Sequence, residues 1–262
     1  MTRPLPLRCL PNRLRQSAYY RYYHRRHGEW PVLFKAAPLA FAPDVRMFDL
    51  PAGDVISGNI AFNGFYELDL SRRIVALARE GGLLVDVGAN MGYFSLLWCA
   101  SHSSARAIAY EASPRVAPRM ASNIRNNQLA DRISLVEKAA SKEAGVVEFS
   151  LGPADQTGWG GITASADVRT VAVAAVRLDE ELGATPVDVL KIDVEGADTF
   201  VLYGCEALLR KRLIKTIFFE QNPSRMTELG IDQDDARRYL SDLHYTCEAL
   251  DDAGTEWMAR PA

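Results

Sequence analysis

The sequence predicts an α/β protein whose core is a mostly parallel β-sheet with helices on both faces. From Leu83 onward, short apolar runs alternate with segments whose apolar residues follow helical spacing, which is the pattern of strands joined by crossover helices. The chain has 262 residues, of which 48% are hydrophobic and 24% are charged, as in an ordinary globular protein. This length suits one large α/β domain, or a domain of about 200 residues with an appended arm.

Each predicted element follows from its own local pattern, because strands are continuous apolar runs and helices repeat apolar residues at intervals of three or four. Two short strands around the turn at 251–254 close the chain and suggest one antiparallel strand inserted at the sheet edge. A glycine-containing loop occupies 152–169. The other expected strands are 83–87, 105–110, 133–137, 146–151, 170–176, 187–192 and 214–220, and the expected helices are 69–80, 93–99, 114–127, 197–209 and 232–243.

The start of the chain differs in charge from the rest. Within residues 1–35, seven arginines and Lys35 face one acid, Glu29, a balance of about +7 that leaves the remaining residues near −10 in a chain of net charge −3. We therefore expect a basic, aromatic N-terminal arm with its lead-in over 1–54 and a cofactor-binding domain over 55–262. The asymmetry argues against a protein whose whole surface binds nucleic acid.

The arm itself is expected to be only partly regular. Tyrosines and arginines alternate over 17–27, where a short helix within 13–26 is expected, and 44–62 is expected to be an extended lead-in or a small hairpin. Such an arm could form a lid over an active site, a contact in a homo-oligomer, a patch for an anionic carrier-linked substrate or a grip on nucleic acid. Nucleic acid is the least expected of these partners.

Two classes of protein are not expected from this sequence. No apolar run reaches the roughly 18–20 residues that a membrane span needs, and the arginine-rich start has no apolar stretch of signal-peptide length. The four cysteines lie far apart without a C-x-x-C pair, so they are expected to be reduced thiols in a cytoplasmic protein.

The turn after the first predicted strand has the features of a cofactor site. Gly88 and Gly92 flank Asn90 in a G-x-N-x-G sequence, and glycine lets the backbone turn tightly and approach a ligand. A dinucleotide-binding turn has G-x-G-x-x-G, and Asp86 before this turn suits a cationic amino-acid group better than a pyrophosphate. Glu111 ends the next strand, where it can accept hydrogen bonds from ribose hydroxyls. Together these features favour S-adenosylmethionine; the alternative is a structural turn with a solvated glutamate.

Five motifs stand out along the chain. They are Gly64-Phe-Tyr-Glu67, the run from Asp86 to Ser95, the asparagines Asn123, Asn126 and Asn127, Leu178-Asp179, and Lys191-Ile-Asp-Val-Glu-Gly-Ala-Asp198. Over roughly residues 55–223 the chain thereby resembles the FkbM family of S-adenosylmethionine-dependent methyltransferases. Asp198 stands where that family usually has Glu, and Asn222 replaces the histidine of its Glu-x-His-Pro sequence.

The resemblance implies a class I methyltransferase (Rossmann-like) fold, with a mostly parallel seven-stranded sheet and one antiparallel edge strand. It also implies O-methylation of a hydroxyl on a small molecule, sugar or secondary metabolite, so the expected partner is a small-molecule or glycan acceptor. The cofactor-binding residues that it implies are Tyr66, Glu67, Asp86, Gly88, Ala89, Asn90, Gly92, Glu111, Ala112, Ala139 and Asp193. Within this set, Glu111 would hold the ribose, and Ala112 and Ala139 would lie near the adenine.

Three carboxylates are candidates for catalysis. Asp193 and Glu195 follow one strand and Glu220 ends a neighbouring one, so all three are expected at the same sheet edge. A neutral hydroxyl acceptor must lose a proton to a base. We expect Asp193 to lie nearest the acceptor, as base or hydroxyl anchor; the alternative is that it caps the helix beginning near Ala197.

The acceptor site is expected to include Trp159, Gly160 and Asn222. The glycines of the loop at 157–162 give it mobility, and Trp159 offers a flat face to a sugar ring or an apolar chain, unless it packs inward as part of a simple connector. Asp193, Glu220 and Asn222 could also hold Mg²⁺ or Ca²⁺, although we expect no metal.

Two other functions use the same core. An RNA methyltransferase would grip its substrate with the basic arm, and a catalytically silent protein would keep the cofactor pocket alone. The spacing of the glycine-rich turn argues against a dehydrogenase.

Overall fold

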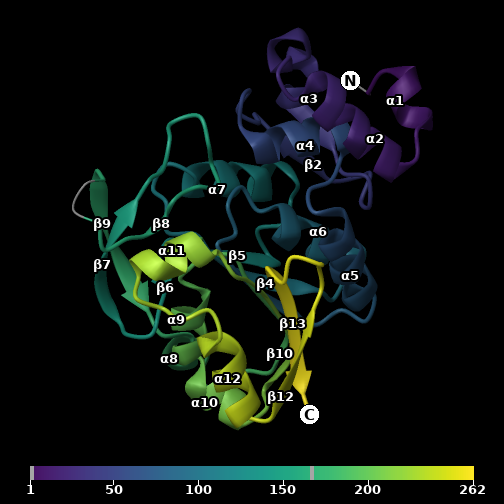
Figure 1. Ribbon diagram of the computed structural model, residues 1–262. Coiled ribbons are helices and arrows are strands. Elements are labelled where there is room, and N and C mark those ends of the chain that lie inside the picture. The colour runs from purple at the N-terminus through teal and green to yellow at the C-terminus, as the bar shows by residue number, and fades with distance from the viewer. Residues whose placement is uncertain (1–2, 166–167) are drawn as a thin grey trace.

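The computed structural model describes residues 3–165 and 168–262 and confirms the expected α/β fold (Figure 1). Its main sheet has seven strands, in the order β12 (Tyr245–Ala249), β13 (Glu256–Pro261), β11 (Ile214–Glu220), β10 (Val187–Ile192), β3 (Leu83–Val87), β4 (Arg106–Tyr110) and β5 (Ile133–Val136). Strands β11, β10, β3, β4 and β5 run parallel, and β13 is antiparallel to both of its neighbours. The expected antiparallel strand is therefore present, inserted next to the edge with β12 outside it.

Helices cover both faces of this sheet, as expected (Figure 1). Successive residues of one strand belong to opposite cores, because side chains alternate along a strand: Leu84 packs in one hydrophobic cluster and Val85 in the other. Both faces are dry, which explains why the strands read as continuous apolar runs. The first cluster includes α5 (Leu68–Ala78), α6 (Tyr93–Ser101) and α7 (Ala117–Asn126), and the second includes α8 (Leu178–Leu182), α9 (Asp198–Tyr203), α10 (Glu206–Arg210) and α12 (Asp235–Asp242).

The helix expected over 197–209 is two shorter helices, α9 and α10. They are separated at Gly204, where an added Cβ would collide with the carbonyl oxygen of Ser141. The close approach of these two backbones explains the break, which the apolar periodicity alone does not reveal.

A second, four-stranded sheet extends from the main one, in the order β6 (Ala139–Ala140), β9 (Thr170–Val176), β7 (Gly145–Ser150) and β8 (Gly161–Ile162) (Figure 1). Strands β7 and β9 are the predicted strands 146–151 and 170–176, paired antiparallel with each other. The loop between β7 and β8 contains Trp159.

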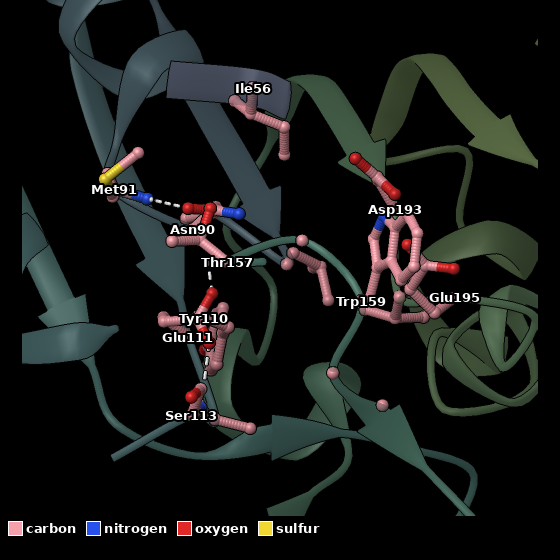
Figure 2. Close-up of a pocket in the computed structure, with 18 of the residues that line it drawn as sticks. Ile56, Asn90, Met91, Tyr110, Glu111, Ser113, Thr157, Trp159, Asp193 and Glu195 are labelled. Atoms are coloured by element: carbon pink, nitrogen blue, oxygen red, sulfur yellow. Dashed lines mark hydrogen bonds between the residues drawn. The ribbon is translucent and has the colours of Figure 1, made fainter. Parts of the chain in front are cut away.

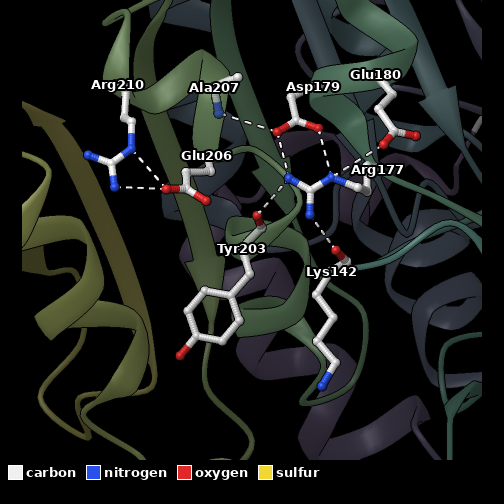
Figure 3. A network of polar contacts seen from close by, with 8 residues as sticks. All are labelled: Lys142, Arg177, Asp179, Glu180, Tyr203, Glu206, Ala207 and Arg210. Atoms are coloured by element: carbon white, nitrogen blue, oxygen red, sulfur yellow. Dashed lines mark hydrogen bonds and ion pairs between the residues drawn. The ribbon is translucent and has the colours of Figure 1, made fainter.

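The Leu178-Asp179 motif has a structural role at the junction of β9 and α8 (Figure 3). The Asp179 carboxylate accepts hydrogen bonds from Arg177 at 2.7 and 3.1 Å and from the amide of Ala207, in the first turn of α10, at 3.3 Å. Arg177 also donates to the carbonyl oxygens of Lys142 and Tyr203. The motif therefore fastens the second sheet to the helices behind β10.

The N-terminal arm is mostly helical. Its elements are α1 (Leu5–Cys9), α2 (Asn12–Ala18), the π-helical turn η1 (Tyr19–Tyr23), the 3-10 turn η2 (His27–Glu29), α3 (Pro31–Lys35), and the antiparallel strands β1 (Ala36–Pro38) and β2 (Arg46–Phe48). The helix expected within 13–26 is thus α2 continuing into η1. No helix in the described part of the chain is long and apolar enough to cross a bilayer.

The expectation of an extended lead-in is wrong beyond residue 54, where the chain forms α4 (Val55–Asn63). The Asp54 side chain caps this helix by accepting a hydrogen bond from the amide of Ser57 at 2.7 Å, and Gly64 ends it with φ +86°. Gly58 lies inside this helix, and the side chain of Tyr19 occupies the space where a Cβ would stand.

The arm docks on α4 through one buried arginine and two aromatic rings. The Arg3 guanidinium donates to the carbonyl oxygens of Ala61 at 3.1 Å and Ile60 at 2.9 Å, in the last turn of α4. The rings of Tyr19 and Tyr23 pack on Phe62, with centroids 5.7 and 4.5 Å away. These tyrosines are therefore committed to packing.

Replacing Arg3 by Met should lower the free energy of unfolding by about 1.5–3 kcal/mol, since hydrogen bonds to a charged group typically contribute that much. Urea denaturation measures this loss. The matched control is Arg8→Met, because Arg8 is an exposed arginine of the same arm. Equal stability of the two variants would contradict the anchoring role of Arg3.

Candidate active site

A cavity of about 190 Å³ opens at the carboxyl ends of the parallel strands. This is the sheet edge at which α/β proteins bind ligands. Figure 2 shows Asn90, Glu111 and Ser113 on one side of the cavity, and Trp159, Asp193 and Glu195 on the other. The predicted site residues that line it are Tyr66, Gly88, Ala89, Asn90, Glu111, Ala112, Ala139, Trp159, Gly160, Asp193, Glu195 and Glu220.

The glycine-rich turn forms the floor of the cavity. Gly88 has φ +74°, and a Cβ there would collide with the carbonyl oxygen of Asp193, so only glycine lets the turns after β3 and β10 meet. The amides of Gly88 and Ala89 both donate to the carbonyl oxygen of Tyr110, at 3.0 and 3.1 Å. Asn90 also has a positive φ, of 52°, and its Oδ1 atom accepts a hydrogen bond from the amide of Met91 at 2.7 Å.

Glu111 joins this turn to the end of β4. Its Oε2 atom accepts from the amide of Asn90 at 2.7 Å, and its Oε1 atom accepts from the amide of Ser113 at 2.8 Å. Burial raises the pKa of Glu111 to about 7, although both backbone hydrogen bonds oppose the shift. The carboxylate is thus held in a fixed orientation at the wall of the cavity.

Asp86 and Gly92 lie beneath the cavity wall rather than on it. The Asp86 side chain is fully buried, and its Oδ2 atom accepts a hydrogen bond from Ser95 at 2.7 Å. Gly92 has φ +90° at the N-terminus of α6 and packs against Met120. Asp86 turns away from the cavity because alternation along β3 puts it on the face opposite Val87, which does line the cavity.

Lys191 is a buried cation that the sequence analysis did not single out. Its Nζ atom lies 3.1 Å from Asp193 Oδ2 and 3.8 Å from Asp86 Oδ1, and 5.2 Å from the ring centroid of Phe94. Burial favours the neutral amine, yet the carboxylates of Asp193, Asp86 and Glu67 raise the pKa of Lys191 above its ordinary value. Lys191 therefore stays charged and orients Asp193.

Four acidic side chains gather where β10 and β11 end. Burial, followed by the negative charge of Asp193, raises the pKa of Glu195 to about 7 and that of Asp198 to about 7. The same two causes raise the pKa of Glu220 above its ordinary value. Strong shifts of this kind in a cleft are typical of functional sites.

Asp198, a buried member of this cluster, fixes its geometry through hydrogen bonds to the backbone. It accepts hydrogen bonds from the amides of Glu220 at 3.0 Å and Val194 at 3.4 Å, so one buried carboxylate links the turns after β10 and β11. Asp193 makes no capping hydrogen bond to α9, whose preceding residue is Ala197. The alternative that Asp193 caps this helix is therefore wrong.

Tyr66 lines the cavity, whereas Glu67 lines a smaller neighbouring pocket behind Lys191 and Asp193. Burial and then the charge of Asp193 raise the pKa of Glu67 to about 8. Glu67 is therefore not part of the cavity lining, although its charge helps to raise the pKa of Lys191.

Helix α4 supplies a wall of the cavity that the sequence analysis missed, since Val55, Ile56 and Ile60 all line it. The buried Asp54 side chain also accepts hydrogen bonds from the Thr157 amide at 2.8 Å and hydroxyl at 3.1 Å. This clamp closes the loop over the cavity, and its partners lie 103 residues apart in sequence.

Trp159 does not pack inward, because 55% of its surface is exposed. It lines both the cavity and a second, wider groove, which also contains Asn222. Asn222 Nδ2 donates to Glu195 Oε2 at 3.2 Å, and its side-chain oxygen caps α11 (Pro223–Glu228). Asn222 thus positions one of the predicted catalytic carboxylates.

The cavity fits S-adenosylmethionine in the chemistry of its lining. Each Glu111 oxygen keeps a lone pair for a ribose hydroxyl, Ala112 and Ala139 offer apolar contact, and the carboxylates suit a cation. Within residues 3–165 and 168–262, no group of three or more His, Cys, Asp or Glu residues is arranged so that it could hold a metal ion.

Comparison with known proteins agrees with this chemistry. The profile of the methyltransferase FkbM domain family matches residues 86–247. The hexuronic acid methyltransferase AglP of Haloferax volcanii is 23% identical over 182 residues, which cover 70% of this chain and 71% of that protein. The 2-O-methyltransferase NoeI of Sinorhizobium fredii is 29% identical over 177 residues, covering 59% of this chain and 70% of that protein.

Among solved structures, precorrin-6y C5,15-methyltransferase of Geobacter metallireducens aligns with a TM-score of 0.46 at 13% identity, covering 76% of this chain and 90% of that one. The family profile, by contrast, spans more than half of the chain, and its match includes the glycine-rich turn, Glu111 and the carboxylates after β10 and β11. The chain belongs to the FkbM family of S-adenosylmethionine-dependent methyltransferases.

Proposed function

We propose that this protein transfers the methyl group of S-adenosylmethionine to a hydroxyl of a sugar or other small molecule. The observation that carries the proposal is that one cavity contains both Glu111, suited to ribose, and three carboxylates, suited to a hydroxyl acceptor. The relatives support this choice of acceptor, since one is named for 2-O-methylation, which is transfer to an oxygen, and the other for a hexuronic acid, which is a sugar.

The residues of the chain divide into two groups by role. When bound, the cofactor supplies a methyl group on a positively charged sulfur. Glu111 would bind its ribose hydroxyls, Asn90 and Ala89 its amino-acid part, and Ala112 and Ala139 its adenine. Holding the two reactants in contact is itself a large part of catalysis, because it replaces an encounter between free molecules.

The carboxylates would hold and deprotonate the acceptor. The Asp193 carboxylate pairs with Lys191 at 3.1 Å, so we assign it to anchor the acceptor hydroxyl. Glu195, oriented by Asn222, would take the proton as the methyl group is transferred. A base is most effective when its pKa lies near the working pH, and the pKa of Glu195, about 7, meets that condition.

The direct test incubates the purified protein with S-adenosylmethionine and a panel of neutral and acidic sugars. Mass spectrometry should detect products heavier by one methylene group. Binding of the cofactor without transfer to any hydroxyl compound, together with methylation of RNA, would overturn the proposal in favour of an RNA methyltransferase.

Replacing Asp193 by Asn should lower kcat about 100-fold or more, because a neutral amide anchors the hydroxyl less firmly and no longer pairs with Lys191. The affinity for S-adenosylmethionine, measured by calorimetry, should change little. Asp252→Asn is the control, since Asp252 is exposed on a turn. Unchanged turnover in Asp193→Asn would remove this residue from the mechanism.

The rate should also depend on pH through Glu195. A base acts only when deprotonated, so kcat/KM should rise as the pH passes through about 7, the pKa that burial and Asp193 impose against the opposing charges of Arg225 and Lys191. Glu195→Gln should remove this rise and lower kcat/KM by about 10²–10⁴. The exposed Glu143→Gln should keep both the rate and the profile. A profile that is the same in Glu195→Gln would assign the base elsewhere.

A further inference from the structure

A second groove, of about 740 Å³, begins where the cofactor cavity ends. The two share Trp159, Glu195 and Glu220, so a molecule lying in the groove has one end at the catalytic carboxylates. The groove is also lined by Arg169 and Arg225. Its lining therefore combines two carboxylates with two guanidinium groups.

Trp159 lies at the boundary between cavity and groove as a rigid flat surface. Its carbonyl oxygen would be 2.7 Å from a Cβ placed on Gly152, so the loop backbone folds back on itself without room for another side chain. A Cβ placed on Gly160 would likewise lie 3.0 Å from the carbonyl oxygen of Ser150. An exposed indole held in this way presents an apolar face to a ring lying in the groove.

Arg225 extends along the other wall. Its side chain is only 22% exposed, and its Nη1 atom lies 3.4 Å from Glu228 on the outer side. Its Nη2 atom is near Gly161, at 3.3 Å from the point where a Cβ would stand, and Glu195 Cβ is 3.2 Å from the same point. The guanidinium and the proposed base thus flank one glycine.

The charge of the groove contrasts with that of the domain around it. Outside the N-terminal arm the chain carries about −10, so an anionic small molecule would be repelled by most of its surface. Arg169 and Arg225 place two positive charges within this groove, where they can attract an anion. A guanidinium binds carboxylate or phosphate through two parallel hydrogen bonds, which gives specificity as well as affinity.

We propose that this groove binds an anionic sugar, with its ring against Trp159, its carboxylate or phosphate group on Arg225 and Arg169, and its reactive hydroxyl toward Glu195 and Asp193. The inference rests on the proposed function and names the class of acceptor. A long nucleic acid fits less well, because its phosphates would also approach the carboxylates of Glu195 and Glu220.

The test compares three sugars on protein saturated with S-adenosylhomocysteine, the demethylated cofactor. Methyl glucuronide carries a carboxylate, glucose 6-phosphate carries a phosphate, and methyl glucoside is neutral. In calorimetric titration, at least one of the two anionic sugars should bind at least about tenfold more tightly than the glucoside. Whichever anionic sugar binds more tightly shows whether the groove prefers a carboxylate or a phosphate.

Variants locate this preference. Arg225→Gln should abolish the preference for an anionic sugar, and Arg225→Lys should retain part of it through charge alone. Trp159→Ala should weaken the binding of all three sugars by a similar factor. The control is Arg238→Gln, because Arg238 is an arginine on the exposed face of α12 and should leave every affinity unchanged.

Equal affinities for methyl glucuronide, glucose 6-phosphate and methyl glucoside would overturn the inference. A preference for an anionic sugar that survives in Arg225→Gln would also overturn it. Binding of a single-stranded RNA oligonucleotide that is lost in Arg225→Gln would overturn it in favour of nucleic acid. The affinity for S-adenosylhomocysteine is measured first and separates the two proposals: its absence refutes the cofactor site, while its presence without sugar selectivity refutes only the groove. The same measurement shows that each variant is folded.

Discussion

The buried carboxylate of Glu111 is the contact on which the cofactor site depends. It accepts one backbone hydrogen bond from the turn after β3 and another from the turn after β4, so the ends of two adjacent strands are fixed by a single side chain. Without it, the amides of Asn90 and Ser113 would lose partners in a region of low dielectric, where unpaired polar groups are costly. The same side chain that joins the two turns also lines the cavity.

A second set of charges fixes the turns after β10 and β11, where we propose that the acceptor binds. Lys191 lies between Asp86, beneath the cavity, and Asp193, on its wall, while Asp198 joins the turns after β10 and β11. Removing one member of a buried group of this kind leaves the others uncompensated, which explains why such groups resist substitution. The short side chain of Asp198 reaches both amides. The carboxylates at this edge of the sheet are thus held in place by charges buried beneath the cavity.

Much of this could be predicted from the sequence, and the rest depends on contacts between distant segments. The strands were predictable because both faces are buried, and Gly88 and Glu111 because they follow strand ends. Helix α4 was missed because it is buried nearly all round and lacks the one-sided periodicity of a surface helix. The roles of Ile56 and Thr157 arise only when α4 meets a loop about a hundred residues away, a contact that no local pattern encodes.

Calorimetry of cofactor binding tests the central claim, that S-adenosylmethionine is held by Glu111 where β3 and β4 end. The wild-type protein should bind S-adenosylmethionine and release no heat with NAD. Glu111→Gln should weaken the binding of S-adenosylmethionine about tenfold or more, because a neutral amide cannot accept hydrogen bonds at both of its terminal atoms. The exposed Glu143→Gln should bind the cofactor like the wild type. Binding of NAD in place of S-adenosylmethionine, or full affinity in Glu111→Gln, would contradict the account.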